Sequence, residues 1–274
     1  MAYSDMELSV DDAKPIELYE IVYGLSRWYY TSADRNITYD SKVYKAVPCS
    51  HGDVEQAISG EKAQLMVMFP HYAEFGEVFR VQPPSEVVSL TLMVQNYLSP
   101  GDYITLWRGR VLNVDWKFPN MEVLVENIFT SMNRVGLRRR YSAQCPHALY
   151  SVQCGVNANL YRDSSFVLTI DGTGITVQSV IGTVNNYYAG GYVTWINNAN
   201  GNIEKRMIVA SNGTTGVLQL TGPTVGLSVS QAISMYAGCD HTISTCSSKF
   251  NNSDNCGAIP YIPSSSPFGG SSLY

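Results

Sequence analysis

The sequence predicts a mainly β protein. Short runs rich in aromatic and β-branched residues recur along the chain, turn residues separate them, and no segment shows a long helical period. The chain has 274 residues, of which 45% are hydrophobic and 15% are charged. This balance is typical of a folded chain, and the length allows one large or two to three small domains. We expect an N-terminal β-barrel or sandwich, followed by a domain that carries an inserted small β-barrel.

Residues 1–133 are expected to form the N-terminal β-rich region. Strands are predicted in ELYEIVYG (17–24), WYYT (28–31), VYKAV (43–47), QLMVMF (64–69), VVSLTLMV (87–94), YITLWRGRVLNVDWKF (103–118) and NMEVLVENIFTSM (120–132). The alternation of apolar residues slips at Arg108–Arg110, which predicts a bulge or a bend. SPGD (99–102) predicts a turn, and a short helix is expected only within 70–81.

The sequence pattern of residues 161–237 predicts an inserted β module of five to seven short strands. Asp171-Gly172, Asn200-Gly201 and Asn212-Gly213 are typical of tight turns between paired strands. The module starts shortly after Cys154 and ends shortly before Cys239, so its two ends are expected to meet. The tail is rich in Ser, Gly, Pro and Asn from residue 247 onward, and residues 257–274 are expected to form an extended arm.

Four of the six cysteines form two pairs that flank this module. Cys145 and Cys154 have eight residues between them, and Cys239 and Cys246 have six. Thiolates select soft metals such as zinc, copper(I) or iron–sulfur clusters. Paired ligands of structural zinc usually lie two to four residues apart, so these gaps are wide for zinc. A [4Fe–4S] cluster is larger than one ion and accepts more widely spread ligands. Spacing alone leaves zinc, a cluster, disulfides and unligated thiols all open.

Basic residues and histidines lie near the cysteines in the sequence. A thiolate-bound cluster carries negative charge, which nearby cations and polar groups would offset. The candidates are Arg138, Arg139, Arg140, His147 and His241. The two histidines are expected beside the ligands or on the surface, and direct ligation, as in Rieske centres, is the less favoured alternative. PHALYSVQ (146–153) is expected to form one helical turn, with Pro146 at its first position.

The charge and the N-terminal sequence limit the cellular compartment and the kinds of partner that we expect. The first residues are polar and acidic, so no secretory signal is expected, and no run approaches the roughly 18 apolar residues of a membrane span. In a cytosol, paired cysteines are more often metal ligands than disulfides. The net charge of −5 argues against direct nucleic-acid binding.

Two cysteine segments carry a family resemblance. QCPHALYSVQCGVN (144–157) and AGCDHTISTCSSKFNN (237–252), with a β module between them, resemble the tail-tip or baseplate-hub family of long-tailed phages and gene transfer agents, of the lambda tail-tip type. YTSADRNITYDSKVYKAVP (30–48) and WRGRVLNVDW (107–116), together with ELYEIVYG, are similar to the hub region of that family.

The resemblance implies a cofactor and a place of action. It implies that Cys145, Cys154, Cys239 and Cys246 hold a [4Fe–4S] cluster, in an iron–sulfur-binding domain made of residues 134–160 and 238–256. It also implies a structural virion protein at the tail tip, assembled in the host bacterial cytoplasm. Such a protein would be an oligomer, usually a trimer, between the distal tail protein and the central tip or fibre protein, near the tape measure protein. Cys256 departs from the family pattern and could replace a neighbouring ligand.

Other classes of protein compete with this hypothesis. The sequence contains no GxSxG elbow, P-loop or HExxH motif, so a hydrolytic or nucleotide-using enzyme is not expected. The alternatives are a redox-active iron–sulfur protein, a zinc-stabilised tail protein, and a receptor- or carbohydrate-binding protein. In the last of these, sugars would stack on Tyr187, Tyr188, Tyr192 and Trp195.

Overall fold

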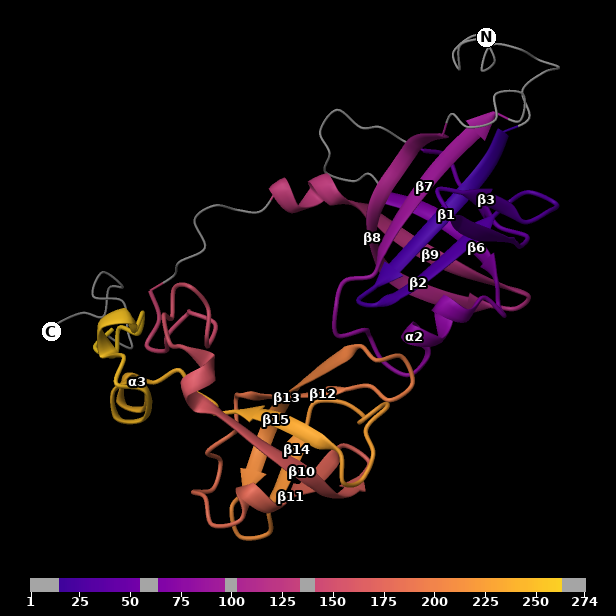
Figure 1. Cartoon of the computed structure of the whole chain (residues 1–274). Coiled ribbons are helices and arrows are strands. Elements are labelled where there is room, and N and C mark those ends of the chain that lie inside the picture. Colours follow the sequence, from indigo (N-terminus) through magenta and orange to yellow (C-terminus); the bar gives the residue numbers. More distant parts are fainter. Residues whose placement is uncertain (1–14, 55–63, 97–102, 134–140, 263–274) are drawn as a thin grey trace, which may run out of the picture. The chain divides into compact units, whose positions relative to one another are not determined.

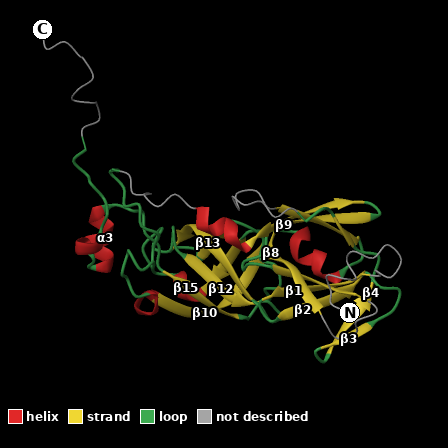
Figure 2. Cartoon of the chain, turned by 90° about the horizontal axis from the view of Figure 1, so that it is seen from above, coloured by secondary structure: helices red, strands yellow, loops and turns green. Residues whose placement is uncertain are grey.

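The computed structural model describes residues 15–54, 64–96, 103–133 and 141–262, and the chain divides into two compact units, Met1–Val135 and Gly136–Tyr274. Strands dominate both units, which confirms the mainly β prediction (Figures 1 and 2). The predicted turn at 99–102 and the cluster Arg138–Arg140 lie outside the described residues.

The N-terminal unit contains one nine-stranded sheet. Its strands pair in the order β3-β4-β2-β1-β7-β8-β9-β6-β5. They are β1 (Pro15–Tyr23), β2 (Ser26–Thr31), β3 (Ile37–Tyr39), β4 (Lys42–Ala46), β5 (Ser50–His51), β6 (Gln64–Pro70), β7 (Ser89–Asn96), β8 (Tyr103–Lys117) and β9 (Asn120–Asn127). Every second residue of β6 (Leu65, Val67 and Phe69) is buried, as expected for a strand with one face on a core.

This sheet is strongly rolled. Tyr30 of β2 and Phe69 of β6 are separated by four strands in the pairing order, yet their ring centroids lie 5.7 Å apart. Neighbouring strands are spaced about 4.8 Å apart, so a flat sheet would hold these rings roughly 24 Å apart. Tyr19 and Phe75 join the same aromatic group, at 5.3 and 5.0 Å from Phe69. One core therefore fills the inside of the roll.

The expectation of a closed barrel or a two-sheet sandwich in this unit is corrected. The pairing order is open, with β3 and β5 at its edges. Strand β5 has only two residues, and both pair with β6. Its other edge therefore offers few backbone groups for hydrogen bonds to a further strand. Side chains make the closing contact instead: His51 Nε2 of β5 lies 3.3 Å from Glu17 Oε1 of β1.

The predicted slip in β8 is present as two register shifts. One falls opposite Leu92 and Met93 of β7, and the other lies between Val111 and Asn113 against β9, so the shifts flank Arg108–Arg110. The short helix expected within 70–81 is confirmed as the 3-10 turn Glu74–Gly76 and α2 (Glu77–Arg80).

The strand predicted over 120–132 is too long. It ends at Asn127, and a 3-10 turn follows at Ile128–Asn133. The side chain of Asn127 accepts a hydrogen bond from the Phe129 backbone N–H at 3.0 Å, and its carbonyl accepts one from Thr130 Oγ1 at 2.8 Å. Beyond Asn127 these local hydrogen bonds replace the interstrand hydrogen bonds of the sheet.

The C-terminal unit contains a closed six-stranded barrel, which confirms the prediction of a small barrel. Its strands are β10 (Arg162–Asp171), β11 (Gly174–Val177), β12 (Tyr192–Ile196), β13 (Ile203–Asn212), β14 (Val217–Leu220) and β15 (Ala232–Tyr236), in the order β10-β11-β14-β13-β12-β15. The three predicted turns are present, closed by the pairs Asp171 with Gly174, Ile196 with Ile203, and Asn212 with Val217.

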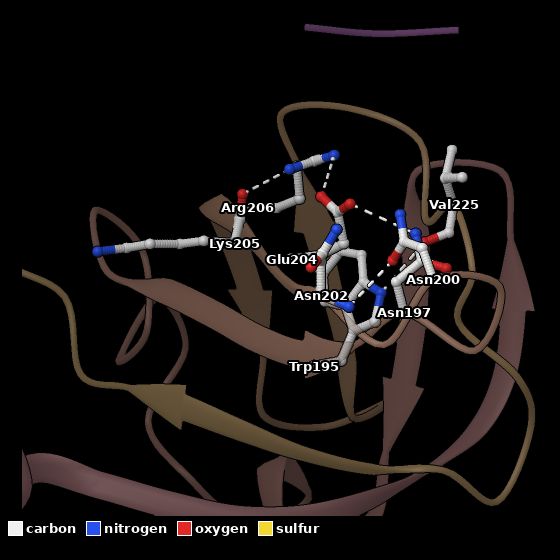
Figure 3. Close-up of polar contacts among 8 residues, drawn as sticks. All are labelled: Trp195, Asn197, Asn200, Asn202, Glu204, Lys205, Arg206 and Val225. Atoms are coloured by element: carbon white, nitrogen blue, oxygen red, sulfur yellow. Dashed lines mark hydrogen bonds and ion pairs between the residues drawn. The ribbon is translucent and has the colours of Figure 1, made fainter. Parts of the chain in front are cut away.

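One part of the barrel is polar inside. Glu204 and Arg206 are buried neighbours on β13, and their Oε2 and Nη2 atoms lie 3.0 Å apart. Asn197 donates to Glu204 at 3.4 Å, and the Arg206 guanidinium lies 5.7 Å from the centre of the Trp195 ring (Figure 3). The buried charges are therefore paired and hydrogen-bonded, as burial requires.

The two ends of the barrel meet, as expected. Arg162 at the start of β10 pairs with Tyr236 at the end of β15. The segment before β10 and the segment after β15 consequently leave the barrel side by side. Beyond β15 the chain forms α3 (Ile243–Phe250) and the 3-10 turn Ser253–Asn255.

Candidate metal centre

A single pocket in the C-terminal unit brings five cysteines together. We call it the cysteine pocket, and it is lined by Cys145, Cys154, Cys239, Cys246 and Cys256, with His147 and His241 beside them. The sixth cysteine, Cys49, is buried in the core of the N-terminal unit. The structure thus places all four predicted ligands and the two histidines predicted beside them at one site, and adds Cys256 to them.

The first cysteine loop consists of turns. No helix forms over 146–153, so the helical turn predicted there is corrected. Isolated turns are closed instead by the Ser151 N–H, which donates to the Ala148 carbonyl at 3.1 Å, and by the Gly155 N–H, which donates to the Ser151 carbonyl at 2.9 Å. Tyr150 has a φ of 63°, a left-handed conformation that interrupts a helix. The Tyr150 hydroxyl donates to the Ala237 carbonyl at 2.6 Å, which ties this loop to the end of the barrel.

The second cysteine loop contains a helix that the sequence analysis did not predict. Thr242 caps the start of α3, since its side chain accepts a hydrogen bond from the Thr245 N–H. Asn251 ends it with a φ of 46°, the left-handed conformation common after helices. Cys246 and Phe250 lie one turn apart and are the buried residues of this helix, so α3 turns its cysteine inward.

Hydrogen bonds join the two loops directly. Cys145 N–H donates to the His241 carbonyl at 2.8 Å, and the His241 ring Nδ1 lies 3.0 Å from the Cys145 carbonyl oxygen. Asn252 Nδ2 donates to the Cys154 carbonyl at 2.6 Å. Segments far apart in sequence are therefore held together by backbone and side-chain contacts that do not involve sulfur.

Two sulfur atoms already accept backbone hydrogen bonds. His241 N–H lies 3.3 Å from Cys239 Sγ, and Gly257 N–H lies 3.3 Å from Cys145 Sγ. Hydrogen bonds to cluster sulfurs are one way in which proteins tune iron–sulfur sites. Burial raises the pKa of the Cys239 thiol, and burial together with Cys256 raises the pKa of Cys246 to about 12. Metal binding at such thiols releases protons, because the bound form is the thiolate.

A half-buried lysine, Lys249, lies next to the pocket. Lys249 Nζ on α3 donates to the Gly238 carbonyl at 2.7 Å and to the Tyr187 carbonyl, and it sits 4.0 Å from the centre of the Tyr187 ring. Burial lowers the pKa of Lys249. This residue fastens α3 to the backbone just before Cys239, a role that the sequence analysis assigned to no residue.

The donor set of the pocket consists of cysteine thiols, whose deprotonated forms are ligands for soft metals. Five soft ligands line one pocket, and backbone N–H groups point at two of the sulfurs. Among the residues that the structure describes, no three His, Cys, Asp or Glu side chains are arranged to hold a single metal ion.

The aromatic residues considered for sugar binding are engaged elsewhere. Tyr188 and Trp195 are each 2% exposed and belong to the barrel core. Tyr192 stacks on Tyr236 with ring centroids 4.3 Å apart, and Lys205 Nζ lies 3.6 Å from the centre of the Tyr192 ring. Tyr187 has Lys249 over its ring. Packing therefore accounts for these side chains.

Part of the chain matches a family model and a curated relative. The family model described as "Phage conserved hypothetical protein BR0599" matches residues 186–266. An uncharacterized protein of Xylella fastidiosa (strain 9a5c) is 22% identical over an alignment of 134 residues, and the match covers 45% of this chain and 28% of that protein. The matched region thus spans little more than a quarter of that relative.

A solved structure shares the fold of the whole chain. A chain from the virion of the native gene transfer agent (GTA) particle superposes with a TM-score of 0.77, covering 99% of this chain and 98% of that chain. The two are 16% identical, so the likeness is one of fold. Within the described residues, no helix is long and apolar enough to cross a membrane.

Proposed function

We propose that this chain is a structural, non-enzymatic protein of a phage-like virion, located in the tail tip or baseplate hub. The observation that carries the proposal is the fold likeness over nearly the whole chain to a chain of a GTA virion. The match of residues 186–266 to a phage family model supports the same class of protein.

The proposed position is between the distal tail protein and the central tip or fibre protein, near the tape measure protein, in a homo-oligomer such as a trimer. A ring component must expose surface for several partners. Two neighbouring aromatic residues of the N-terminal unit offer such surface: Phe118 is 87% exposed and Tyr72 is 60% exposed, and both rings contact His71. Exposed apolar side chains that gather in this way are typical of interaction sites.

The proposed cofactor is a [4Fe–4S] cluster held by Cys145, Cys154, Cys239 and Cys246, with zinc as the alternative. The five cysteine thiols that line the cysteine pocket support it, because their deprotonated forms are soft ligands. When bound, the cluster would supply covalent links between the two cysteine loops, and four cysteine ligands leave no iron site open for chemistry. His241 and Lys249 hold the loops in position around it.

Labelling of particles tests the proposed position. Antibodies against this chain, detected by immunogold electron microscopy on purified particles, should mark the tail tip. Particles from a strain that lacks the gene are the control and should stay unlabelled. Label on the capsid, or absence of the chain from purified particles by mass spectrometry, would refute the tail-hub assignment.

A further inference from the structure

The cysteine pocket has one thiol more than a [4Fe–4S] cluster needs. Four thiolates fill such a cluster, whereas five cysteines line the pocket. The fifth, Cys256, follows the 3-10 turn Ser253–Asn255 in an extended conformation. The inference below concerns this thiol and rests on the proposed cofactor.

Cys246 and Cys256 line the same pocket. The chain between them turns back at Asn252, whose N–H donates to the Cys246 carbonyl at 3.1 Å. The Cys246 thiol also lies 3.1 Å from the Asn252 carbonyl oxygen, to which it donates. A thiolate has no proton to donate, so Cys246 must give up this bond to bind iron. In this arrangement the Cys246 thiol is therefore engaged as a hydrogen-bond donor and is not free to bind iron.

The backbone around Cys256 is already anchored at the pocket. Gly257 N–H donates to Cys145 Sγ, and Ile259 N–H donates to the Ser142 carbonyl at 2.9 Å. A β-carbon on Gly257 would lie 2.8 Å from His147 Nε2, so glycine allows this close approach. The residue after Cys256 thus touches the sulfur of a proposed ligand.

We propose that Cys246 and Cys256 form an interchangeable ligand pair, in which either thiolate completes the cluster with Cys145, Cys154 and Cys239. The thiol that is not bound to iron stays protonated beside the bound one. The pocket then tolerates loss of either member of the pair, and it tolerates loss of none of the other three.

Substitutions in the full chain test the pair. Wild type, Cys246→Ser, Cys246→Ala, Cys256→Ser and the double variant Cys246→Ser/Cys256→Ser are reconstituted anaerobically with ferrous iron and sulfide, and bound iron and acid-labile sulfide are measured. Cys49→Ser, in the core of the other unit, is the matched control. We expect the single variants and the control to keep most of the wild-type iron and sulfide, and the double variant to lose them.

Thiol labelling gives a second readout. Loaded proteins are treated with a maleimide and mapped by mass spectrometry. In wild type, one member of the pair should be labelled, whereas in Cys246→Ser the Cys256 thiol should become protected together with Cys145, Cys154 and Cys239. A purely structural Cys256 would not gain this protection.

The outcomes separate the two proposals. Wild-type protein that binds no iron refutes the proposed cofactor. Wild type with iron, but no iron in both Cys246→Ser and Cys246→Ala, overturns the interchangeable pair and leaves the cofactor standing. Full iron content in the double variant overturns the pair as well, because neither residue would then be a ligand.

Discussion

His51 and Glu17 are the titratable pair that closes the rolled sheet. The hydrogen bond to Glu17 raises the pKa of His51 above its ordinary 6.5. Burial alone would raise the pKa of Glu17, but hydrogen bonds from His51 and Tyr19 lower it below its ordinary 4.5. His51 therefore stabilises the fold below pH 6.5, and this contribution is lost as pH rises through its folded pKa. Glu17 stabilises the fold above pH 4.5, and its contribution to the free energy of unfolding is lost as pH falls through its folded pKa.

The His51–Glu17 pair should make its full contribution to the free energy of unfolding between pH 4.5 and 6.5. His51→Gln removes the titrating group, so its stability should vary less between pH 6 and pH 8.5 than that of wild type, by up to about 1 kcal/mol. Urea unfolding followed by tryptophan fluorescence measures this. Glu17→Gln should abolish the same pH-dependent difference, and a pH profile unchanged in both variants would show that the contact does not form.

Substitutions in the buried ion pair of the barrel should change stability in a different way. Arg206→Met leaves the Glu204 carboxylate buried without its cation, which typically costs about 3–5 kcal/mol. The double variant Arg206→Met/Glu204→Leu removes both charges and should be more stable than the single variant. Urea unfolding measures the stability of both variants. A double variant that loses as much free energy of unfolding as the single variant, or more, would contradict the ion pair shown in Figure 3.

At the scale of elements, α3 depends on Lys249. Lys249→Met keeps the length of the side chain but leaves the carbonyls of Tyr187 and Gly238 without this donor, which should cost about 1–3 kcal/mol. Lys45→Met is the matched control: its exposed pair with Glu74 should matter by less than about 0.5 kcal/mol. Hydrogen exchange should show faster opening of α3 in Lys249→Met, and unchanged exchange there would refute the role of this residue.

Strands and tight turns could be predicted from the sequence, and the cysteine loops could not. Alternation and Asp-Gly or Asn-Gly pairs encode local geometry, so the hairpin at Asp171-Gly172 was predictable. The conformation around Tyr150 depends on its hydroxyl reaching Ala237, 87 residues away in sequence, which no local pattern reports. Helix α3 left weak signals, Thr242 as a cap and Asn251 as a stop, within a stretch whose composition suggested an arm.

For the whole molecule, the sequence predicted the members of the cysteine pocket better than its detailed structure. Two cysteine pairs around a module whose ends meet must come together, and they do. The addition of Cys256 follows from the turn at Ser253–Asn255, which bends the chain back to the pocket. The rolling of the nine-stranded sheet was not predictable, because it is set by contacts such as Tyr30 with Phe69.

Metal and sulfide analysis of the intact chain tests the central claim most directly. The chain, purified without exposure to oxygen, is analysed for iron, acid-labile sulfide and zinc, and its visible absorbance is recorded. A cluster in the cysteine pocket predicts about four iron and four sulfide per chain with broad brown absorbance, both lost in Cys145→Ser. Stoichiometric zinc without iron or sulfide would contradict it.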